Sequence, residues 1–372
     1  MSVRFRLTRA GVGLAGAVGV LSTAMILAAV PASASGAGFL GPLTKIRVIA
    51  STVPANGDIN PYGVAVVPTT IGALHKGDVL ISNFNNSTNA QGTGTTIVEI
   101  TPGGHRRVFA NIAQHQVPGG VGLTTALVAL RTGWVIVGNL PTSNGMSATA
   151  TAGSLLVLDP WGHLREIWTG HGINGPWDAT VADFGDHAAV FVTNVLNGTV
   201  AHSPNTVFRG TVLRLWVSLD KAMPAVEAAT VIGSGFPERT DPAALVVGPT
   251  GVALGQDGTL YVADTVRSRL AAIPNALTRV TSAGDGATVR TGSPLNGPLG
   301  LTVAPNGDLV TVNAGDGRAV EVNPGGVLVS VRWLDRSGAP PGAGALFGLA
   351  VTPGGNALYF VDDATNTLNL LH

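Results

Sequence analysis

The 372-residue sequence predicts an all-β protein, a β-propeller of six four-stranded antiparallel blades, and three observations lead to this prediction. The first is composition, because 51 glycines and 23 prolines without a three-residue period indicate many tight turns rather than collagen. The second is a repeat of about 50 residues that reads as a β-hairpin followed by two further strands. The third is an N-terminal segment of strand composition that can close the ring of blades.

Composition and charge exclude several classes of protein. The 21 basic and 21 acidic residues give a formal net charge of zero, which argues against a nucleic-acid partner. The hydrophobic content of 45% is typical of a chain that buries a core rather than of a disordered polymer. The absence of cysteine excludes disulfides and thiolate metal sites.

The N-terminus has the pattern of a secretory signal. Three arginines within the first nine residues precede an uncharged run over residues 10–30, and Ala32-Ser33-Ala34 follows. We expect cleavage after Ala34, so that 1–34 is the signal peptide and 35–372 forms a single propeller. The mature protein is then secreted or periplasmic, of bacterial type, without stable membrane insertion. The alternative is an uncleaved membrane anchor, because the run is long enough to span a bilayer.

Three copies of the repeat align closely in the C-terminal part of the chain. Each begins at a glycine, turns at an Asp-Gly, Asn-Gly or Gly-Gly pair, and ends its second strand at Asp or Asn. The glycines Gly251, Gly300 and Gly348 are 49 and 48 residues apart. This spacing fits the four strands of one propeller blade.

Three looser copies precede them, and together they predict six blades. They begin at Tyr62-Gly63, Val121-Gly122 and Trp177-Asp178. The last copy has room for only three strands, so we expect residues 45–50 to supply its outermost strand by pairing with residues 367–371. The predicted blades span residues 58–111, 116–170, 172–235, 243–292, 294–340, and 343–372 together with 44–52.

The run at residues 251–270 resembles an NHL repeat, and weaker copies cover roughly residues 58–372. This resemblance implies a six-bladed propeller of the SMP-30/gluconolactonase-like type. Relatives of that shape include extracellular sensor and protein-binding modules, lactonases of the gluconolactonase type and a peptide-amidating lyase. The resemblance therefore implies the fold strongly and the function weakly.

The residue before each repeat glycine, or its equivalent, is predicted to point towards the mouth of the central channel. In gluconolactonase-like enzymes the resemblance implies an Asn at some of these positions, as a ligand of a divalent cation. Here no position carries Asn and only Thr250 offers an aliphatic hydroxyl, although hard cations require oxygen ligands. No cofactor is identified, and a divalent cation such as Ca²⁺ stays an open alternative. The six positions are Tyr62, Val121, Trp177, Thr250, Leu299 and Phe347.

A ring of Asp and Asn residues ends the second strand of every blade. It is either a six-fold polar site or a structural feature, and we favour the structural interpretation because such side chains bond neighbouring backbone and fix turns. The ring consists of Asn83, Asn139, Asn194, Asp264, Asn313 and Asp362.

The first three blades carry long polar loops on the mouth face. The third strand begins 12, 15 and 17 residues after the ring residue in these three blades, and five residues after it in the others. Together with Tyr62, Trp177 and Phe347, these loops predict a binding site for a small molecule, a sugar, a peptide or another protein. Asp178 is the best candidate for a polar anchor or base. The alternatives are tolerated surface insertions and an exposed turn residue.

Two functions therefore stand. The favoured hypothesis is a secreted binding or scaffold module without enzymatic activity, and the alternative is a metal-dependent hydrolase or lyase of the gluconolactonase-like type. If the mouth binds a ligand through Trp177, the substitution Trp177→Ala is expected to weaken binding by about 2 kcal/mol and to leave the fold intact.

Overall fold

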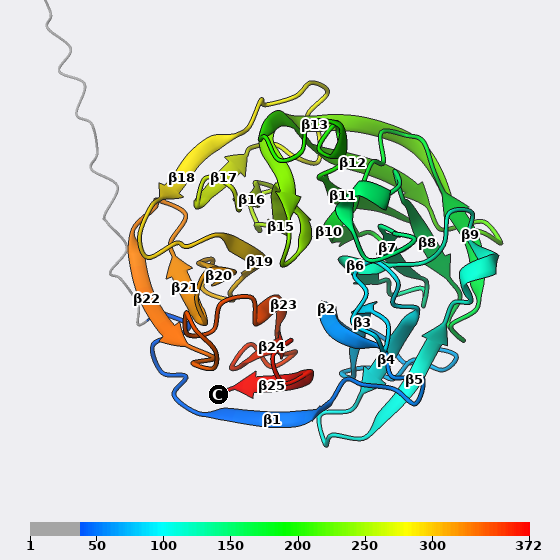
Figure 1. The fold of residues 1–372 in the computed structure, drawn as a ribbon, viewed down its shortest axis with the longest axis horizontal. Coiled ribbons are helices and arrows are strands. Elements are labelled where there is room, and N and C mark those ends of the chain that lie inside the picture. Colours follow the sequence, from blue (N-terminus) through cyan, green and yellow to red (C-terminus); the bar gives the residue numbers. More distant parts are fainter. Residues whose placement is uncertain (1–37) are drawn as a thin grey trace, which may run out of the picture. The chain divides into compact units, whose positions relative to one another are not determined.

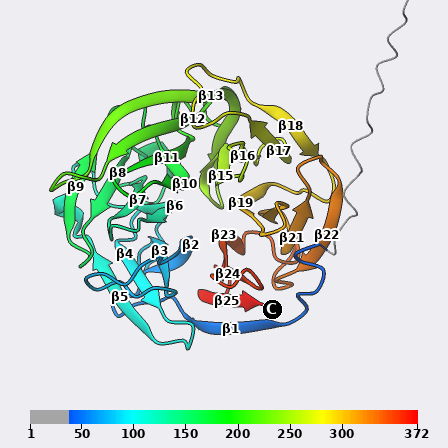
Figure 2. The same cartoon turned by 180° about the vertical axis from the view of Figure 1, so that it is seen from behind.

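The computed structural model describes residues 38–372, so the predicted signal peptide lies outside the described part. Six sheets are arranged around a central axis (Figures 1 and 2). The three helices in this part are single 3-10 turns, η1 (Gln114–Gln116), η2 (Ser147–Thr149) and η3 (Val200–His202). The predicted all-β, six-bladed propeller is confirmed. None of these helices is long and apolar enough to cross a membrane.

The first four strands named for each blade follow one another from the axis outwards, and β14 of blade 3 pairs with the end of β13. Blade 1 comprises β2 (Ile59–Val66), β3 (Val79–Asn85), β4 (Thr96–Ile100) and β5 (Arg106–Asn111). Blade 2 comprises β6 (Leu123–Ala129), β7 (Val135–Asn139), β8 (Ser154–Leu158) and β9 (Leu164–Trp168). Blade 3 comprises β10 (Pro176–Asp183), β11 (His187–Asn194), β12 (Val207–Ser218), β13 (Ala225–Asp241) and β14 (Leu245–Val247).

The second half of the ring is more regular. Blade 4 comprises β15 (Pro249–Leu254), β16 (Leu260–Asp264), β17 (Arg269–Ile273) and β18 (Ala287–Thr291). Blade 5 comprises β19 (Pro298–Val303), β20 (Leu309–Asn313), β21 (Arg318–Val322) and β22 (Leu328–Trp333). Blade 6 comprises β23 (Leu346–Val351), β24 (Leu358–Asp362), β25 (Thr367–Leu371) and β1 (Ile46–Ser51).

Strand β1 closes the ring, as the sequence predicts. It runs antiparallel to β25, with Ile46 opposite Leu371 and Ser51 opposite Thr367. The first and the last strand of the described residues therefore lie side by side at the outer edge of blade 6 (Figure 1). This pairing covers an edge that β25 would otherwise expose to other chains.

The repeat glycine is needed because neighbouring inner strands approach backbone to backbone. A Cβ atom on Gly251 would lie 2.1 Å from the carbonyl oxygen of Leu299 in the next blade. A Cβ atom on Gly348 would lie 2.2 Å from the carbonyl oxygen of Tyr62, where blade 6 meets blade 1. These distances are far below van der Waals contact, so any side chain at these positions forces the blades apart.

Blade 2 differs in register from the sequence alignment. Leu123 pairs with the ring residue Asn139, and the next paired residue is Leu127, so three residues intervene where the other blades have two. Thr124 therefore follows the first paired residue, as Tyr62 does in blade 1. Val121 precedes the strand and is buried in the hydrophobic cluster between blades 1 and 2, so its predicted place at the channel mouth is wrong.

Blade 3 carries an additional segment that crosses the mouth, which we call the mouth strap (residues 239–247). It comprises the end of β13, a turn, and β14, which pairs back on β13. Pro242 lies at the tip of the strap, and its carbonyl accepts a hydrogen bond of 2.9 Å from the Gln91 side chain. This bond links the strap to the long loop of blade 1. The strap therefore spans the mouth from blade 3 to blade 1.

Candidate functional site

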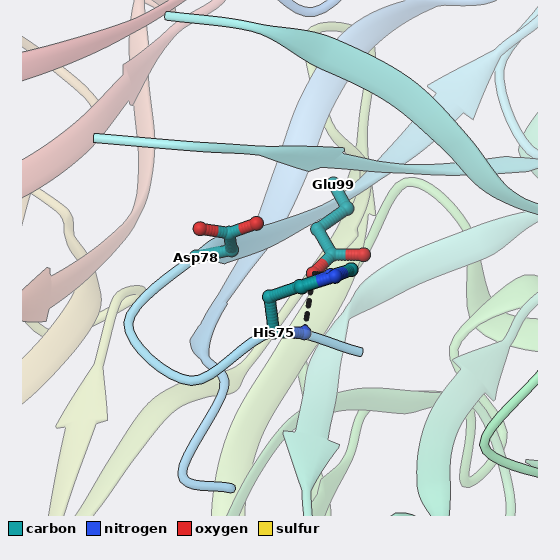
Figure 3. Close-up of side chains that lie close together, drawn as sticks. All are labelled: His75, Asp78 and Glu99. Atoms are coloured by element: carbon teal, nitrogen blue, oxygen red, sulfur yellow. Dashed lines mark hydrogen bonds and ion pairs between the residues drawn. The ribbon is translucent and has the colours of Figure 1, made fainter. Parts of the chain in front are cut away.

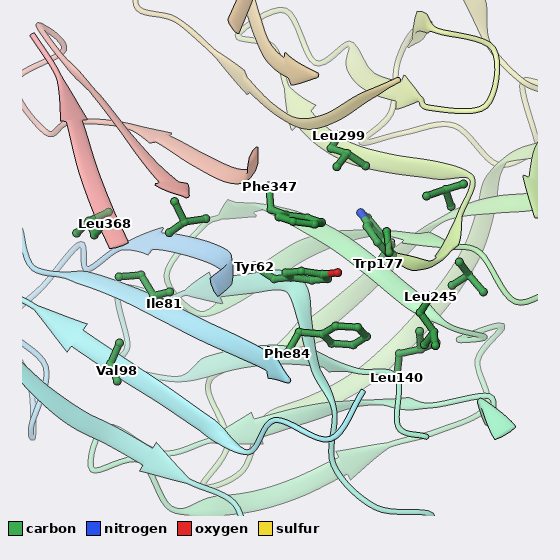
Figure 4. Close-up of a cluster of buried hydrophobic side chains, with 14 of the residues drawn as sticks. Tyr62, Ile81, Phe84, Val98, Leu140, Trp177, Leu245, Leu299, Phe347 and Leu368 are labelled. Atoms are coloured by element: carbon green, nitrogen blue, oxygen red, sulfur yellow. The ribbon is translucent and has the colours of Figure 1, made fainter. Parts of the chain in front are cut away.

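Four aromatic side chains meet at the channel mouth and form what we call the mouth cluster (Tyr62, Phe84, Trp177 and Phe347; Figure 4). The Tyr62 ring stacks between Phe347, at 4.0 Å between ring centroids, and Phe84, at 4.5 Å. The Trp177 ring lies 5.8 Å away at a tilt of 49°. Such contacts stabilise a packed core beyond the area that they bury.

The mouth cluster is buried rather than exposed. Tyr62 has 0% of its surface exposed, Trp177 2% and Phe347 3%. The strap residues from Ala244 to Val247 belong to the same apolar cluster and cover it. The expected exposed aromatic mouth is therefore wrong, because a segment without any repeat signature lies over it.

The mouth is filled unevenly around the ring. The residue after the Asp/Asn ring position is apolar and buried in the first three blades, whereas in the last three it is small or polar. These residues are Phe84, Leu140 and Val195 in blades 1–3 and Thr265, Ala314 and Asp363 in blades 4–6. The sequence contains this signal, but a search for shared repeat positions does not reveal it.

A cavity of about 440 Å³ lies on the side of blades 4–6, and we call it the mouth cavity. Leu299, Phe347 and Val247 supply apolar surface, while Asn296 and Ser268 supply polar groups. Its volume and mixed lining are in the range of small-molecule sites. The strap forms one wall through Arg239, Asp241, Ala243, Ala244 and Val247.

Ionisable groups lie at the edge of the mouth cavity and near the mouth cluster. Arg239 and Asp241 of the strap form an ion pair at 2.9 Å. Burial, with a smaller contribution from the neighbouring Asp362, raises the pKa of Asp363 to about 7. Burial also raises the pKa of Tyr62 well above its ordinary value, so this hydroxyl stays protonated.

Asp178 lies on the other side of the mouth cluster, in the central channel. It lines a cavity of about 230 Å³ together with residues of all six inner strands. Its carboxylate accepts hydrogen bonds from the backbone N–H groups of Ala179, at 2.8 Å, and Val252, at 3.1 Å. Burial raises the pKa of Asp178 to about 8, although these two hydrogen bonds oppose the shift.

The predicted ring of Asp and Asn side chains bonds mainly to loop backbone. The asparagines of blades 2, 3 and 5 accept hydrogen bonds of 2.7 to 3.1 Å from the backbone N–H of the loop before their own inner strand. The aspartates of blades 4 and 6 accept one from the backbone three residues later. Asn83 donates to the Thr52 carbonyl. The ring members are Asn83, Asn139, Asn194, Asp264, Asn313 and Asp362, and all are buried.

The long loops of blades 1 and 2 border a separate polar groove. It is lined by Asp58, Asn86, Thr93, Thr95, Gln114, Gly119, Thr142 and Ser143. Much of its hydrogen-bonding capacity is already used within the protein. The Asp58 carboxylate accepts from the Thr95 backbone and from the hydroxyls of Thr95 and Thr96, at 2.8 to 2.9 Å.

Within residues 38–372, one group of three side chains could hold a metal ion: His75, Asp78 and Glu99 (Figure 3). Glu99 accepts a hydrogen bond of 2.9 Å from the His75 backbone N–H, and His75 Nδ1 lies 3.8 Å from the carboxylate. The Arg107 guanidinium contacts both Glu99 and His75 Nδ1. A metal ion would have to displace this guanidinium.

Blade 5 contains a related acidic pair that holds the N-terminal segment. Asp308 precedes β20 as Asp78 precedes β3, and Glu321 lies opposite the second residue of β20 as Glu99 does in β3. Glu321 accepts hydrogen bonds from the backbone N–H groups of Phe39 and Leu40. Both glutamates therefore anchor a chain segment to the outer part of a blade.

The positions at the mouth do not fit a hard divalent cation. With the corrected register they are Tyr62, Thr124, Trp177, Thr250, Leu299 and Phe347. Only three of these offer an oxygen, each a hydroxyl, and the Thr250 hydroxyl contacts the Thr265 hydroxyl at 2.6 Å. We derive no catalytic step through a metal at the mouth, because six to eight oxygen ligands are typical of calcium sites.

Comparison with known proteins supports the repeat assignment. Residues 247–273 match the NHL repeat, which includes the run identified from the sequence. The chain is a six-bladed β-propeller that carries an NHL repeat. No curated protein matches it.

Solved structures of several propellers are similar to this chain. A gluconolactonase from Xanthomonas campestris is 15% identical, with a TM-score of 0.57 and 90% of each chain covered. A streptogramin B lyase is 14% identical, with a TM-score of 0.53 and coverage of 88% of this chain and 97% of that one. A calcium-binding protein, regucalcin, from Agrobacterium tumefaciens is 14% identical, with a TM-score of 0.51 and coverage of 87% and 93%. At such identities these similarities show the fold alone.

Proposed function

We propose that this protein is an exported binding module whose mouth cavity holds a small, partly apolar ligand such as a sugar derivative or a short peptide. One observation carries the proposal: a cavity of about 440 Å³ lies between the strap and blades 4–6, next to the packed aromatic side chains of the mouth cluster. A cavity of this kind fits a ligand with an apolar face and a few polar groups.

The residues that line the mouth cavity offer contacts for both the apolar face and the polar groups of such a ligand. Leu299 and Phe347 form an apolar floor, because both side chains belong to the buried cluster and also line the mouth cavity. Asn296 and the Arg239–Asp241 pair supply donors and acceptors at its edge. Aromatic and aliphatic surface next to a few polar groups is the usual composition of small-molecule sites.

Export is part of the proposal and rests on the N-terminal sequence. The basic start, the apolar run and the Ala-Ser-Ala site predict removal of residues 1–34. The absence of cysteine is compatible with export, because a chain of this length can be stabilised by its core without disulfides.

The test is a ligand screen followed by a variant that fills the mouth cavity. Ligand-observed NMR with monosaccharides, sugar lactones and tripeptides would identify binders of the purified protein. Ala343 is exposed at the rim of the mouth cavity, so Ala343→Trp places an indole in the space that the ligand occupies. We expect it to abolish binding of any hit and to leave the melting temperature unchanged.

Ala287→Trp is the matched control. Ala287 is exposed on the outermost strand of blade 4, away from the mouth, so this variant should bind like the wild type. Equal binding by wild type and Ala343→Trp would contradict the mouth cavity as the binding site.

A further inference from the structure

A histidine and two carboxylates lie together in blade 1, and we call them the His75 cluster (His75, Asp78 and Glu99; Figure 3). His75 and Asp78 belong to the turn before β3, and Glu99 belongs to β4, which pairs with β3. One ligand atom from each side chain lies within 4.8 Å of the other two. Both acids are buried, whereas the His75 side chain is 55% exposed, so the cluster opens to solvent on the histidine side.

The His75 cluster already holds a positive charge. One guanidinium nitrogen of Arg107 contacts the Glu99 carboxylate and the Ala73 carbonyl. The same nitrogen lies 2.6 Å from His75 Nδ1. A guanidinium has no acceptor, so Nδ1 must be the unprotonated nitrogen of the ring, with its lone pair towards the charge. A metal ion requires a histidine nitrogen in this same state.

Asp78 is the member of the cluster that the guanidinium does not reach. It is 7% exposed, and its carboxylate has no hydrogen bond or ion pair with another group of residues 38–372, whereas Glu99 has both. Burial raises the pKa of Glu99, with a further contribution from the charge of Asp78, although Arg107 opposes the shift. Buried carboxylates are normally paired or bound to a metal ion. A divalent cation would neutralise both carboxylates, where the guanidinium neutralises one.

The kinds of ligand atom select among divalent metal ions. Calcium takes six to eight oxygen ligands and magnesium keeps several of its water molecules, so an imidazole suits neither ion. Zinc is commonly bound by histidine nitrogen together with carboxylate oxygen, with four ligands in a tetrahedron. The three side chains of the His75 cluster supply three such ligands, and the Ala73 carbonyl or a water molecule can supply the fourth.

Blade 5 has the same acidic pair without the other features. Asp308 and Glu321 occupy the equivalent positions, but Pro305 stands where blade 1 has His75. The Glu321 carboxylate is occupied by backbone N–H groups of the N-terminal segment. Within residues 38–372, the combination of an imidazole with two carboxylates is therefore confined to blade 1.

We propose that the His75 cluster binds one zinc ion through its imidazole and its two carboxylates, and that Arg107 holds the place of the ion until it binds. Arg107 belongs to the outermost strand, β5, and its side chain is 34% exposed, so rotation of the side chain releases it into solvent. The ion would tie the turn before β3 to β4. Zinc should therefore stabilise the folded protein, because the unfolded chain does not bring these ligands together.

The experiment titrates the purified protein with zinc chloride in isothermal calorimetry, after treatment with EDTA and dialysis. We expect one zinc ion per chain. Asp78→Asn and His75→Ala should each weaken binding by about tenfold or more, because each removes a ligand. Arg107→Ala should tighten binding by about tenfold, because no charge-assisted hydrogen bonds then have to be broken before the ion enters.

His163→Ala is the matched control. His163 Nδ1 lies 3.2 Å from the Asp159 carboxylate, and the Arg165 guanidinium lies 3.6 Å from the same carboxylate. This group has a histidine, an aspartate and an arginine but lacks the second carboxylate, so the variant should bind zinc like the wild type. Calcium chloride should bind to the wild type much more weakly than zinc chloride.

Melting curves supply a second measurement. Zinc should raise the melting temperature of the wild type and leave that of His75→Ala unchanged; the exposed His75 side chain can be removed without loss of the fold. The proposal is overturned if the wild type binds no stoichiometric zinc, if calcium binds as tightly, or if zinc stabilises both proteins equally. It is also overturned if His75→Ala or a folded Asp78→Asn keeps full affinity, if His163→Ala loses binding, or if Arg107→Ala weakens it.

Discussion

Truncation of Trp177 is the sharpest test of the closed mouth. The side chain is 2% exposed, packs near Tyr62 and belongs to the apolar cluster that the strap covers. A buried aromatic residue removes about 150–250 Å² from water, which at about 25 cal/mol per Å² corresponds to roughly 4–6 kcal/mol. Measured truncations of buried aromatic residues cost about 3–5 kcal/mol. We therefore expect Trp177→Ala to lower the free energy of unfolding by about 4 kcal/mol.

The assay is urea unfolding followed by far-ultraviolet circular dichroism, which does not depend on the fluorescence of the removed indole. Trp161→Ala is the matched control, because Trp161 is 59% exposed. It should change the free energy of unfolding by less than about 0.5 kcal/mol. A loss below about 1 kcal/mol in Trp177→Ala, or equal losses in both variants, would refute a packed mouth cluster.

Three further predictions concern closure, pH and export. Deleting residues 45–51 removes β1 and exposes the edge of β25, so size-exclusion chromatography should show aggregation; a monomer with unchanged melting would contradict ring closure. The raised pKa values of Asp178 (about 8), of Glu238, which is buried in β13 (about 7), and of Asp363 (about 7) mean that the folded protein binds these protons more tightly than the unfolded chain. The free energy of unfolding should therefore fall as pH rises from 5 to 8, by roughly 2–4 kcal/mol for Asp178 because channel water screens part of the charge; stability that rises or stays flat over this range would argue against the burial of these acids. Mass spectrometry of exported protein should find a mature N-terminus at Ser35, whereas an intact Met1 in washed membranes would contradict cleavage.

The sequence predicts most of the ring because its constraints are local and repeated. Each repeat glycine marks a contact between inner strands, and each Asp-Gly or Asn-Gly pair fixes a hairpin; Gly258 and Gly307, for example, have φ of +79° and +87°. The sequence pattern misplaces the register of blade 2, because Val121-Gly122 imitates the repeat just before the strand while the additional residue lies between Leu123 and Leu127. Only the strand pairing of Leu123 with Asn139 reveals the true register.

The candidate site was harder to predict because it depends on where blades differ. The strap has no counterpart in the other blades, so its position over Trp177 follows from long-range packing and not from a pattern. The contrast between Phe84 in blade 1 and Ala314 in blade 5 is visible in the sequence. The small side chain of Ala314 borders a cavity, however, only because the strap forms the opposite wall. The channel position of Asp178 likewise requires knowledge of how the inner strands converge.

The central claim is that the mouth cavity binds the ligand of this protein. A crystal structure of the protein soaked with a hit from the ligand screen tests it most directly. We predict ligand density between the strap and blades 4–6, in contact with Leu299 and Phe347. Density confined to the polar groove of blades 1 and 2, or to the outer surface of a blade, would contradict the claim.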